Sequence, residues 1–130
     1  MTAIEKNFVP YQIALEMKLL EFDEPCIGYF KGNKLSQTSW QYLESQEKVD
    51  YIFGTRGDSI LAPVYSQAFE FFREKHNLHH NICFDIDEEY DKGFICIIKN
   101  KNKTILLENT ESYKEAELDC LKKLIELIKL

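Results

Sequence analysis

The sequence predicts an α+β domain in which a helix, three strands, a second helix, three more strands and a third helix follow one another. Three segments repeat apolar residues at helical spacing. Between them lie short segments of alternating apolar and polar residues, separated by turn residues such as Gly-Asn and Asn-Lys-Asn. Because these turns are short, we expect a mainly antiparallel sheet with the helices packed on it. No linker or low-complexity segment divides the chain, so residues 1–130 are expected to form a single domain.

The middle helix is expected to be the centre of the fold. Within Leu61–Leu78, four residues fall at positions i, i+3, i+4 and i+7 of one helix face: Tyr65, Ala68, Phe69 and Phe72. Pro63 suits the first helical position, and Asn77 suits a left-handed cap after the last turn. A helix with this many aromatic residues is expected to lie across a sheet and fill the core.

The first half of the chain is expected to open with a helix from Pro10 to about Phe22, which the following Asp-Glu-Pro sequence ends. Three strands are then expected, the first two joined as a hairpin by Gly32-Asn33: Cys26–Lys31, Lys34–Trp40 and Val49–Phe53. Gly54–Ser59 is expected to be a flexible connection into the middle helix.

The second half is expected to hold three more strands and the last helix. Ile82, Phe84 and Ile86 alternate with polar or small residues, which predicts a strand with one wet face. Phe94–Lys99 is nearly all apolar and is expected to be central and covered on both sides, and Thr104–Glu108 returns from it. Ser112 and Glu115 form a capping box ahead of a helix predicted over Tyr113–Lys129.

The composition excludes some classes of function. The net charge is −6 and there is no basic tail, which argues against binding nucleic acids through their phosphates alone. The four cysteines include no C-x-x-C pair, which argues against a zinc ribbon or a redox motif. Neither a signal peptide nor an apolar run of membrane-spanning length is present, so we expect reduced thiols and a cytoplasmic location.

Two clusters have the residue types of a catalytic or metal site. His76, His79 and His80 could hold a metal ion, but we expect them to form a helix cap and a loop. Asp85 and Asp87 could hold a divalent ion or act as an acid and a base, but a solvated acidic hairpin tip is the favoured interpretation. No serine lies in a nucleophile elbow, and no cysteine has a histidine neighbour in sequence. The sequence therefore predicts no catalytic residue, no metal ligand and no cofactor.

A small anionic ligand is the binding function that the sequence supports best. Gly54–Ser59 is a loop that contains two glycines and an arginine and leads into a helix, an arrangement found in many anion-binding pockets. It is not a Walker A sequence. The alternative is a surface loop without a ligand. A nucleotide-like ligand needs cations for phosphate and aromatic faces for a base. The candidates are Arg56, Arg73 and Lys75 for the first and Tyr29, Trp40 and Tyr65 for the second. Tyr65 is equally a core position by its spacing, and Arg73 equally a solvated one.

Three blocks together resemble a known family: FVPYQIALEMKLLEFDEPC, LAPVYSQAFEFFREKHNL and SYKEAELDCLKKLIELI. They are similar to small, mostly uncharacterised proteins carried by phages, prophages and mobile elements of Bacteroidetes-type bacteria. The resemblance implies a non-enzymatic accessory protein in the host cytoplasm that counters antiviral defence by sequestering a nucleotide-like signal. A protein-binding module, either an inhibitor of a host protein or a minor virion component, is the alternative.

A homo-oligomer, most simply a two-fold dimer, is also expected. The aromatic content, the uninterrupted apolar strand Phe94–Ile98 and the wide apolar band of the last helix give more apolar surface than so small a fold covers.

Overall fold

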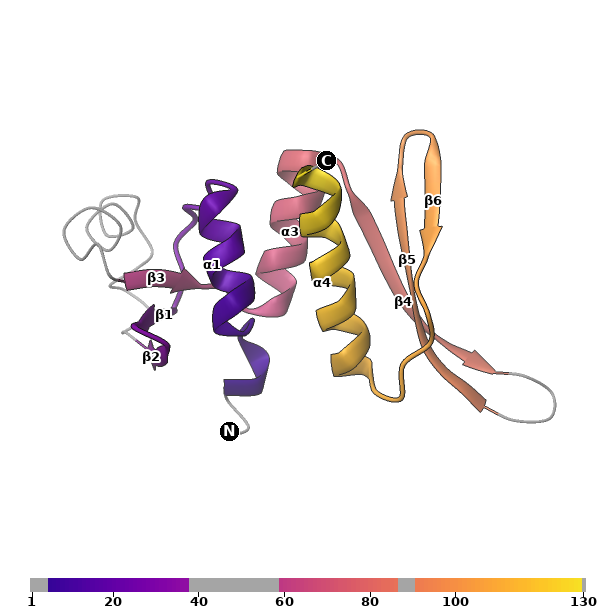
Figure 1. Cartoon of the computed structure of the whole chain (residues 1–130), viewed down its shortest axis with the longest axis horizontal. Helices are drawn as coiled ribbons and strands as arrows, with labels where there is room; N and C mark the ends of the chain where they lie inside the picture. Colours follow the sequence, from indigo (N-terminus) through magenta and orange to yellow (C-terminus); the bar gives the residue numbers. More distant parts are fainter. Residues whose placement is uncertain (1–4, 38–58, 87–90, 130) are drawn as a thin grey trace. The chain divides into compact units, whose positions relative to one another are not determined.

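The protein, seen in a computed structural model, is described for residues 5–37, 59–86 and 91–129 (Figure 1). The chain forms two compact units, Met1–Ala68 and Phe69–Leu130, and the division falls inside helix α3, Tyr65–His76. The predicted fold class and order of elements are confirmed, because helices alternate with two three-stranded antiparallel sheets. The single domain predicted from the sequence stays a prediction. Within the described ranges, no helix is long and apolar enough to cross a membrane.

The first unit is a small sheet with a helix packed on it. Its strands run antiparallel in the order β2-β1-β3, and α1 packs against β3. The elements are the 3₁₀ turn η1 (Glu5–Asn7), α1 (Tyr11–Leu19), β1 (Gly28–Lys31), β2 (Lys34–Gln37) and β3 (Ser59–Ala62).

Helix α1 ends earlier than the expected Phe22. Glu21 takes a left-handed conformation with φ of 67°, and its N–H donates to the carbonyl of Lys18 at 3.0 Å. The N–H of Phe22 donates to the carbonyl of Met17, also at 3.0 Å. This is a Schellman cap, and the burial of both Met17 and Phe22 supplies the hydrophobic contact that accompanies it. The helix therefore stops before Pro25 has any effect.

The expected connection Gly54–Ser59 ends in a strand, so this part of the prediction is wrong at its boundary. Ile60, Leu61 and Ala62 of β3 are all buried and pair with β1. The sequence predicts no strand here, because a short apolar run next to a helix start has no periodicity that identifies it as a buried strand. The strand expected over Val49–Phe53 lies outside the described residues.

Helix α3 begins at Tyr65, two residues after Pro63. The carbonyl of Val64 accepts the first helical hydrogen bond, from Ala68 N–H, so Pro63 precedes the helix instead of opening it. The carbonyl of Pro63 accepts a hydrogen bond from Val9 N–H at 3.0 Å. The predicted left-handed cap is confirmed, since Asn77 has φ of 53°.

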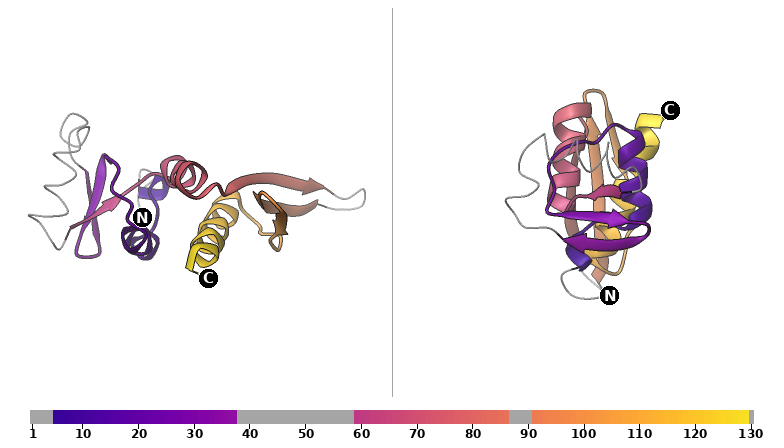
Figure 2. Two further views of the ribbon diagram at one scale, coloured as in Figure 1. Left: turned by 90° about the horizontal axis from the view of Figure 1, so that it is seen from above. Right: turned by 90° about the vertical axis from the view of Figure 1, so that its left-hand side faces the viewer.

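The second unit is a three-stranded sheet with α4 on one face (Figure 2). The strands run antiparallel in the order β4-β5-β6, and α4 packs on β4 and β5. The elements are β4 (His79–Ile86), β5 (Asp91–Asn100), β6 (Lys103–Leu106) and α4 (Tyr113–Lys129). The predicted bounds of α4 are confirmed, and Ser112 Oγ accepts a hydrogen bond from Glu115 N–H at 3.1 Å.

The two faces of this sheet differ. The inner face, under α4, includes Cys96 and Ile98, each 1% exposed. On the opposite face, Ile95 and Ile97 are only partly buried. Strand β5 is central, as expected, and within this unit no other described element lies over its second face.

Candidate functional site

Basic residues gather where α3 ends and β4 begins, a place we call the α3–β4 corner. Arg73, Lys75 and His76 form the last turn of α3, and His79 and His80 are the first residues of β4. The Asn77 cap reverses the chain between the two elements and so brings both sets of side chains to one end of the unit. The predicted loop at His79 and His80 is thus wrong, because both residues are in the strand.

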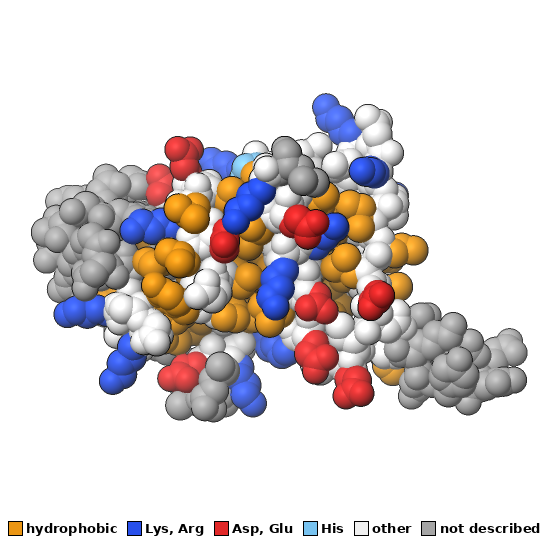
Figure 3. Space-filling view, in the orientation of Figure 1, with side chains coloured by type: hydrophobic (Ala, Val, Ile, Leu, Met, Phe, Trp, Pro, Cys, Tyr) orange, Lys and Arg blue, Asp and Glu red, His pale blue; other side chains and the backbone are white. Residues whose placement is uncertain are grey.

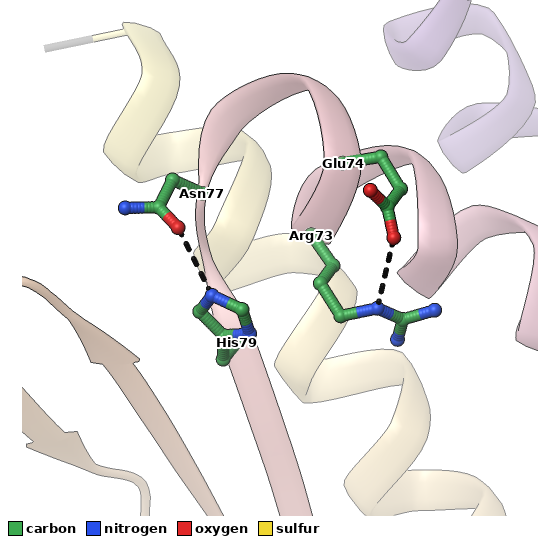
Figure 4. Close-up of polar contacts among 4 residues, drawn as sticks. All are labelled: Arg73, Glu74, Asn77 and His79. Atoms are coloured by element: carbon green, nitrogen blue, oxygen red, sulfur yellow. Dashed lines mark hydrogen bonds and ion pairs between the residues drawn. The ribbon is translucent and has the colours of Figure 1, made fainter.

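Two polar contacts order the corner (Figure 4). His79 Nε2 lies 3.0 Å from Asn77 Oδ1, which can only accept, so the contact requires the tautomer with its proton on Nε2. Arg73 Nε lies 3.6 Å from Glu74 Oε1, and these side chains are 42% and 65% exposed. An ion pair this exposed contributes little to stability, so Arg73 can exchange Glu74 for another anion at low cost.

His80 is the half-buried member of the corner. Its ring stacks on Phe69 with centroids 3.6 Å apart and planes 10° apart. Burial, and to a lesser degree the nearby charge of Arg73, lowers the pKa of His80 to about 4. The ring is therefore neutral at pH 7 and has one N–H donor.

The strand register explains why His80 turns inward. His80 pairs with Ile98, two positions before the Ile82–Cys96 pair, so it shares the face that α4 covers. The period-two pattern of Ile82 and Phe84, continued two residues toward the N-terminus, puts His80 on the same face and so predicts that it points inward. The sequence prediction missed it because it began the strand after the histidines.

Lysines extend the basic character along this end of the sheet. Lys99 pairs with His79 on the outer face, and Lys101 and Lys103 follow at the β5–β6 turn. All three lysines are exposed. Figure 3 shows Lys and Arg side chains at the tip of this hairpin. A protein of net charge −6 therefore has a locally basic end.

The structure places the predicted ligand residues in different parts of the chain. Arg73 and Lys75 are exposed at the corner. Tyr65 is buried at 8% exposure in α3, and Tyr29 is half-buried in β1, so both belong to the first unit. Trp40 and Arg56 lie outside the described residues.

The predicted acidic and histidine clusters form no metal site in the ranges that the structure describes. No group of three or more His, Cys, Asp or Glu side chains there is arranged to hold a metal ion. Asp85 is in β4, whereas Asp87 lies outside the described residues.

Two thiols meet inside the second unit, which the sequence prediction did not foresee. Cys96 of β5 and Cys120 of α4 are both buried, and a hydrogen bond between their side chains lowers the pKa of Cys96 and raises that of Cys120. Cys26 is buried in the first unit, which raises its pKa. Cys83 is exposed on the outer face of the sheet. Cys96 and Cys120 are far apart in sequence, and no local pattern predicts that they meet.

Glu117 is a buried carboxylate on α4, 8% exposed. Lys114 Nζ lies 3.2 Å from its Oε1, close enough for an ion pair, although this oxygen accepts no hydrogen bond with acceptable geometry from a described residue. The negative charge of Glu117 contributes to the raised pKa of Tyr113 and of Cys120. We interpret Glu117 as the buried partner of an i, i+3 ion pair with the exposed Lys114.

Comparison of the chain with protein-family models, with curated proteins and with solved structures finds no match. The resemblance to small phage proteins therefore stays a prediction, and the argument for function rests on the corner itself.

Proposed function

We propose that the chain is a non-enzymatic binding protein that holds a small phosphate-bearing molecule at the α3–β4 corner and acts by sequestering it. The observation that carries this proposal is geometric: Arg73 lies in the last turn of α3 with its exposed side chain 3.6 Å from Glu74, and His80 lies at the start of β4 with its ring stacked on Phe69. A guanidinium and a ring N–H at one place are complementary to phosphate oxygens.

The roles of the side chains follow from their chemistry. Arg73 would leave the weak contact with Glu74 and donate two parallel hydrogen bonds to one phosphate group. Lys75, two residues further along in the same last turn, would add a second positive charge to this end of the helix. His80 would donate its N–H, and its stacking on Phe69 fixes the plane in which that donor points.

Binding would also change the charge of His80. A phosphate beside the imidazole favours the protonated ring, so the pKa of His80 would rise from about 4 on binding. The complex would therefore take up protons as the pH falls, and the affinity would increase.

The described residues of the corner provide contacts for phosphate but no exposed aromatic face for a base. Phe69 is 3% exposed and already covered by His80. The sequestered ligand is therefore defined here by its phosphates. In a phage or mobile-element accessory protein, a nucleotide-like defence signal would be the corresponding target.

The test is calorimetric titration of the full chain with inorganic pyrophosphate and with a cyclic dinucleotide. Arg73→Ala is expected to weaken binding by about 1.5–3 kcal/mol, the contribution of a charge-assisted hydrogen bond. Lys122→Ala is the matched control, because Lys122 is an exposed cation on a different element, α4, and it should leave the affinity unchanged.

Equal losses in the two variants would mean that binding follows net charge and not the corner. Absence of binding by both ligands would contradict the proposal outright. Chromatography of the incubated ligand gives a second readout, since the appearance of product would show turnover and contradict sequestration.

A further inference from the structure

Two thiols from different layers of the second unit meet in its interior. Cys96 lies on the central strand β5 and pairs with Ile82 of β4, on the face under α4. Cys120 lies on α4, which packs on this strand. The two residues are 1% and 0% exposed, and a hydrogen bond joins their side chains. The two sulfur atoms are therefore neighbours and are shielded from water.

We infer that Cys96 and Cys120 form a reversible dithiol pair, which a peroxide oxidises to a disulfide that fixes α4 to the β4–β5–β6 sheet. Both are free thiols in the structure. A disulfide requires Cβ atoms about 3.5–4.5 Å apart. Because the fold already brings the two side chains into hydrogen-bond contact, the bond needs side-chain rotation and a small adjustment of α4, with no change in strand pairing. The inference does not depend on a ligand at the corner.

The surroundings give the two thiols different roles. The hydrogen bond from Cys120 favours the thiolate of Cys96 and lowers its pKa, against the opposite effects of burial and of Asp119. The same hydrogen bond, then burial and the charges of Cys96 and Glu117, raise the pKa of Cys120, so this thiol keeps its proton. Cys96 is therefore the nucleophile, and Cys120 is the thiol that completes the disulfide.

The reaction balances with one molecule of hydrogen peroxide. The Cys96 thiolate attacks a peroxide oxygen and the O–O bond breaks, which gives a sulfenic acid and a hydroxide that takes up the proton released by Cys96. The sulfur of Cys120 then attacks the sulfur of Cys96. The S–S bond forms, the S–O bond breaks, and the hydroxyl leaves as water with the proton of Cys120. The two thiols lose two electrons, which the peroxide gains.

The burial of the pair determines how fast it reacts and what the bond does. Peroxide reaches the sulfurs only when α4 opens locally, so oxidation is expected to be slow. Once formed, the disulfide joins two positions that are far apart in sequence and lie on different layers. Such a cross-link restricts the unfolded chain more than the folded one. The oxidised protein is therefore expected to be the more stable form, and excess thiol is expected to reverse the change by exchange.

Oxidation of the native, full-length chain with hydrogen peroxide tests the pair. Free thiols are then blocked with iodoacetamide in denaturant, and the peptides are analysed by mass spectrometry without reductant. We expect a peptide that links Cys96 to Cys120, which dithiothreitol removes. The Tm of the oxidised chain is expected to lie at least about 5 °C above that of the reduced chain, and to return after dithiothreitol.

Cys83→Ser is the matched control, because Cys83 is an exposed thiol on the outer face of the sheet, the face away from α4. This variant should keep both the linked peptide and the Tm shift, whereas Cys120→Ala should lose both. The wild-type chain and Cys83→Ser carry the test if Cys120→Ala folds poorly. Arg73→Ala should also keep the link and the shift, which separates this test from that of the corner.

A wild-type chain in which Cys83 oxidises while Cys96 and Cys120 stay unlinked would overturn the proposal. So would a link that forms only in the urea-denatured chain, because the folded structure would then not bring the two sulfurs together. A link that leaves the Tm unchanged would overturn the fixing of α4. Sulfinic acid at Cys96 beside a free Cys120 thiol would contradict the role of Cys120.

Discussion

The two faces of the β4–β5–β6 sheet are made from one strand, yet they have different environments. Ile98 is 1% exposed under α4, whereas its neighbour Ile97 points to the outer face and is only partly buried. The residue type is the same and the backbone is continuous, so the difference comes from what packs on each face. An apolar strand shows that both of its faces avoid polar residues, but it does not show what covers them.

The largest effect is expected at Phe72 of α3. Phe72 is fully buried, so Phe72→Ala removes most of a ring and leaves a cavity. We expect a loss of about 3–5 kcal/mol in the free energy of unfolding, measured by urea denaturation. Arg73→Ala, one residue along, is expected to stay within about 0.5 kcal/mol. Similar losses of stability in Phe72→Ala and Arg73→Ala would contradict the burial of the Phe72 side of α3 in the core.

The adjacent isoleucines give the sharpest comparison between the faces. Ile98→Ala is expected to cost about 2–4 kcal/mol, because the side chain is buried beneath α4. Ile97→Ala is expected to cost about 1 kcal/mol or less in dilute protein, since water already reaches the site. Urea denaturation at low protein concentration measures both. A larger loss of stability for Ile97→Ala than for Ile98→Ala would mean that α4 covers the other face of the sheet.

The sequence predicted most of the fold for local reasons. Ser112 and Glu115 identify the start of α4, and Asn77 identifies the end of α3, because capping depends on a few neighbouring residues. Strand β3 was missed because its three buried residues run directly into Pro63 and the helix, without a turn residue between them.

The candidate site was predicted only in part, since it depends on contacts between distant residues. Arg73 and Lys75 were named as ligand residues, but the stacking of His80 on Phe69 follows from how α3 lies against β4. The contact between Cys96 and Cys120 depends in the same way on where α4 packs. No local pattern encodes either contact.

The pH dependence of stability tests the inward position of His80. Its pKa is about 4 in the folded chain and 6.5 for a free histidine, so the unfolded state binds a proton that the folded state does not. The stabilisation is therefore complete above pH 6.5 and is lost as the pH falls toward 4.

We expect a loss of about 1–2 kcal/mol over that range, after allowance for solvent screening at a half-buried ring. His80→Gln should lack this component of the pH dependence. Thermal denaturation across the pH range measures the difference. If the stability of the wild-type chain and of the His80→Gln variant changes with pH in the same way, His80 is exposed to water and the inward position is contradicted.

The most direct test of the two-face account is the rate at which iodoacetamide modifies each cysteine in the dilute, native protein, followed by peptide mass spectrometry. Cys83 lies on the outer face and is exposed, whereas Cys96, Cys120 and Cys26 are at most 4% exposed. We expect Cys83 to react like a free thiol and the other three at least about 100-fold more slowly, because they require local opening. Modification of Cys96 as fast as Cys83 would contradict the assignment of the covered and open faces.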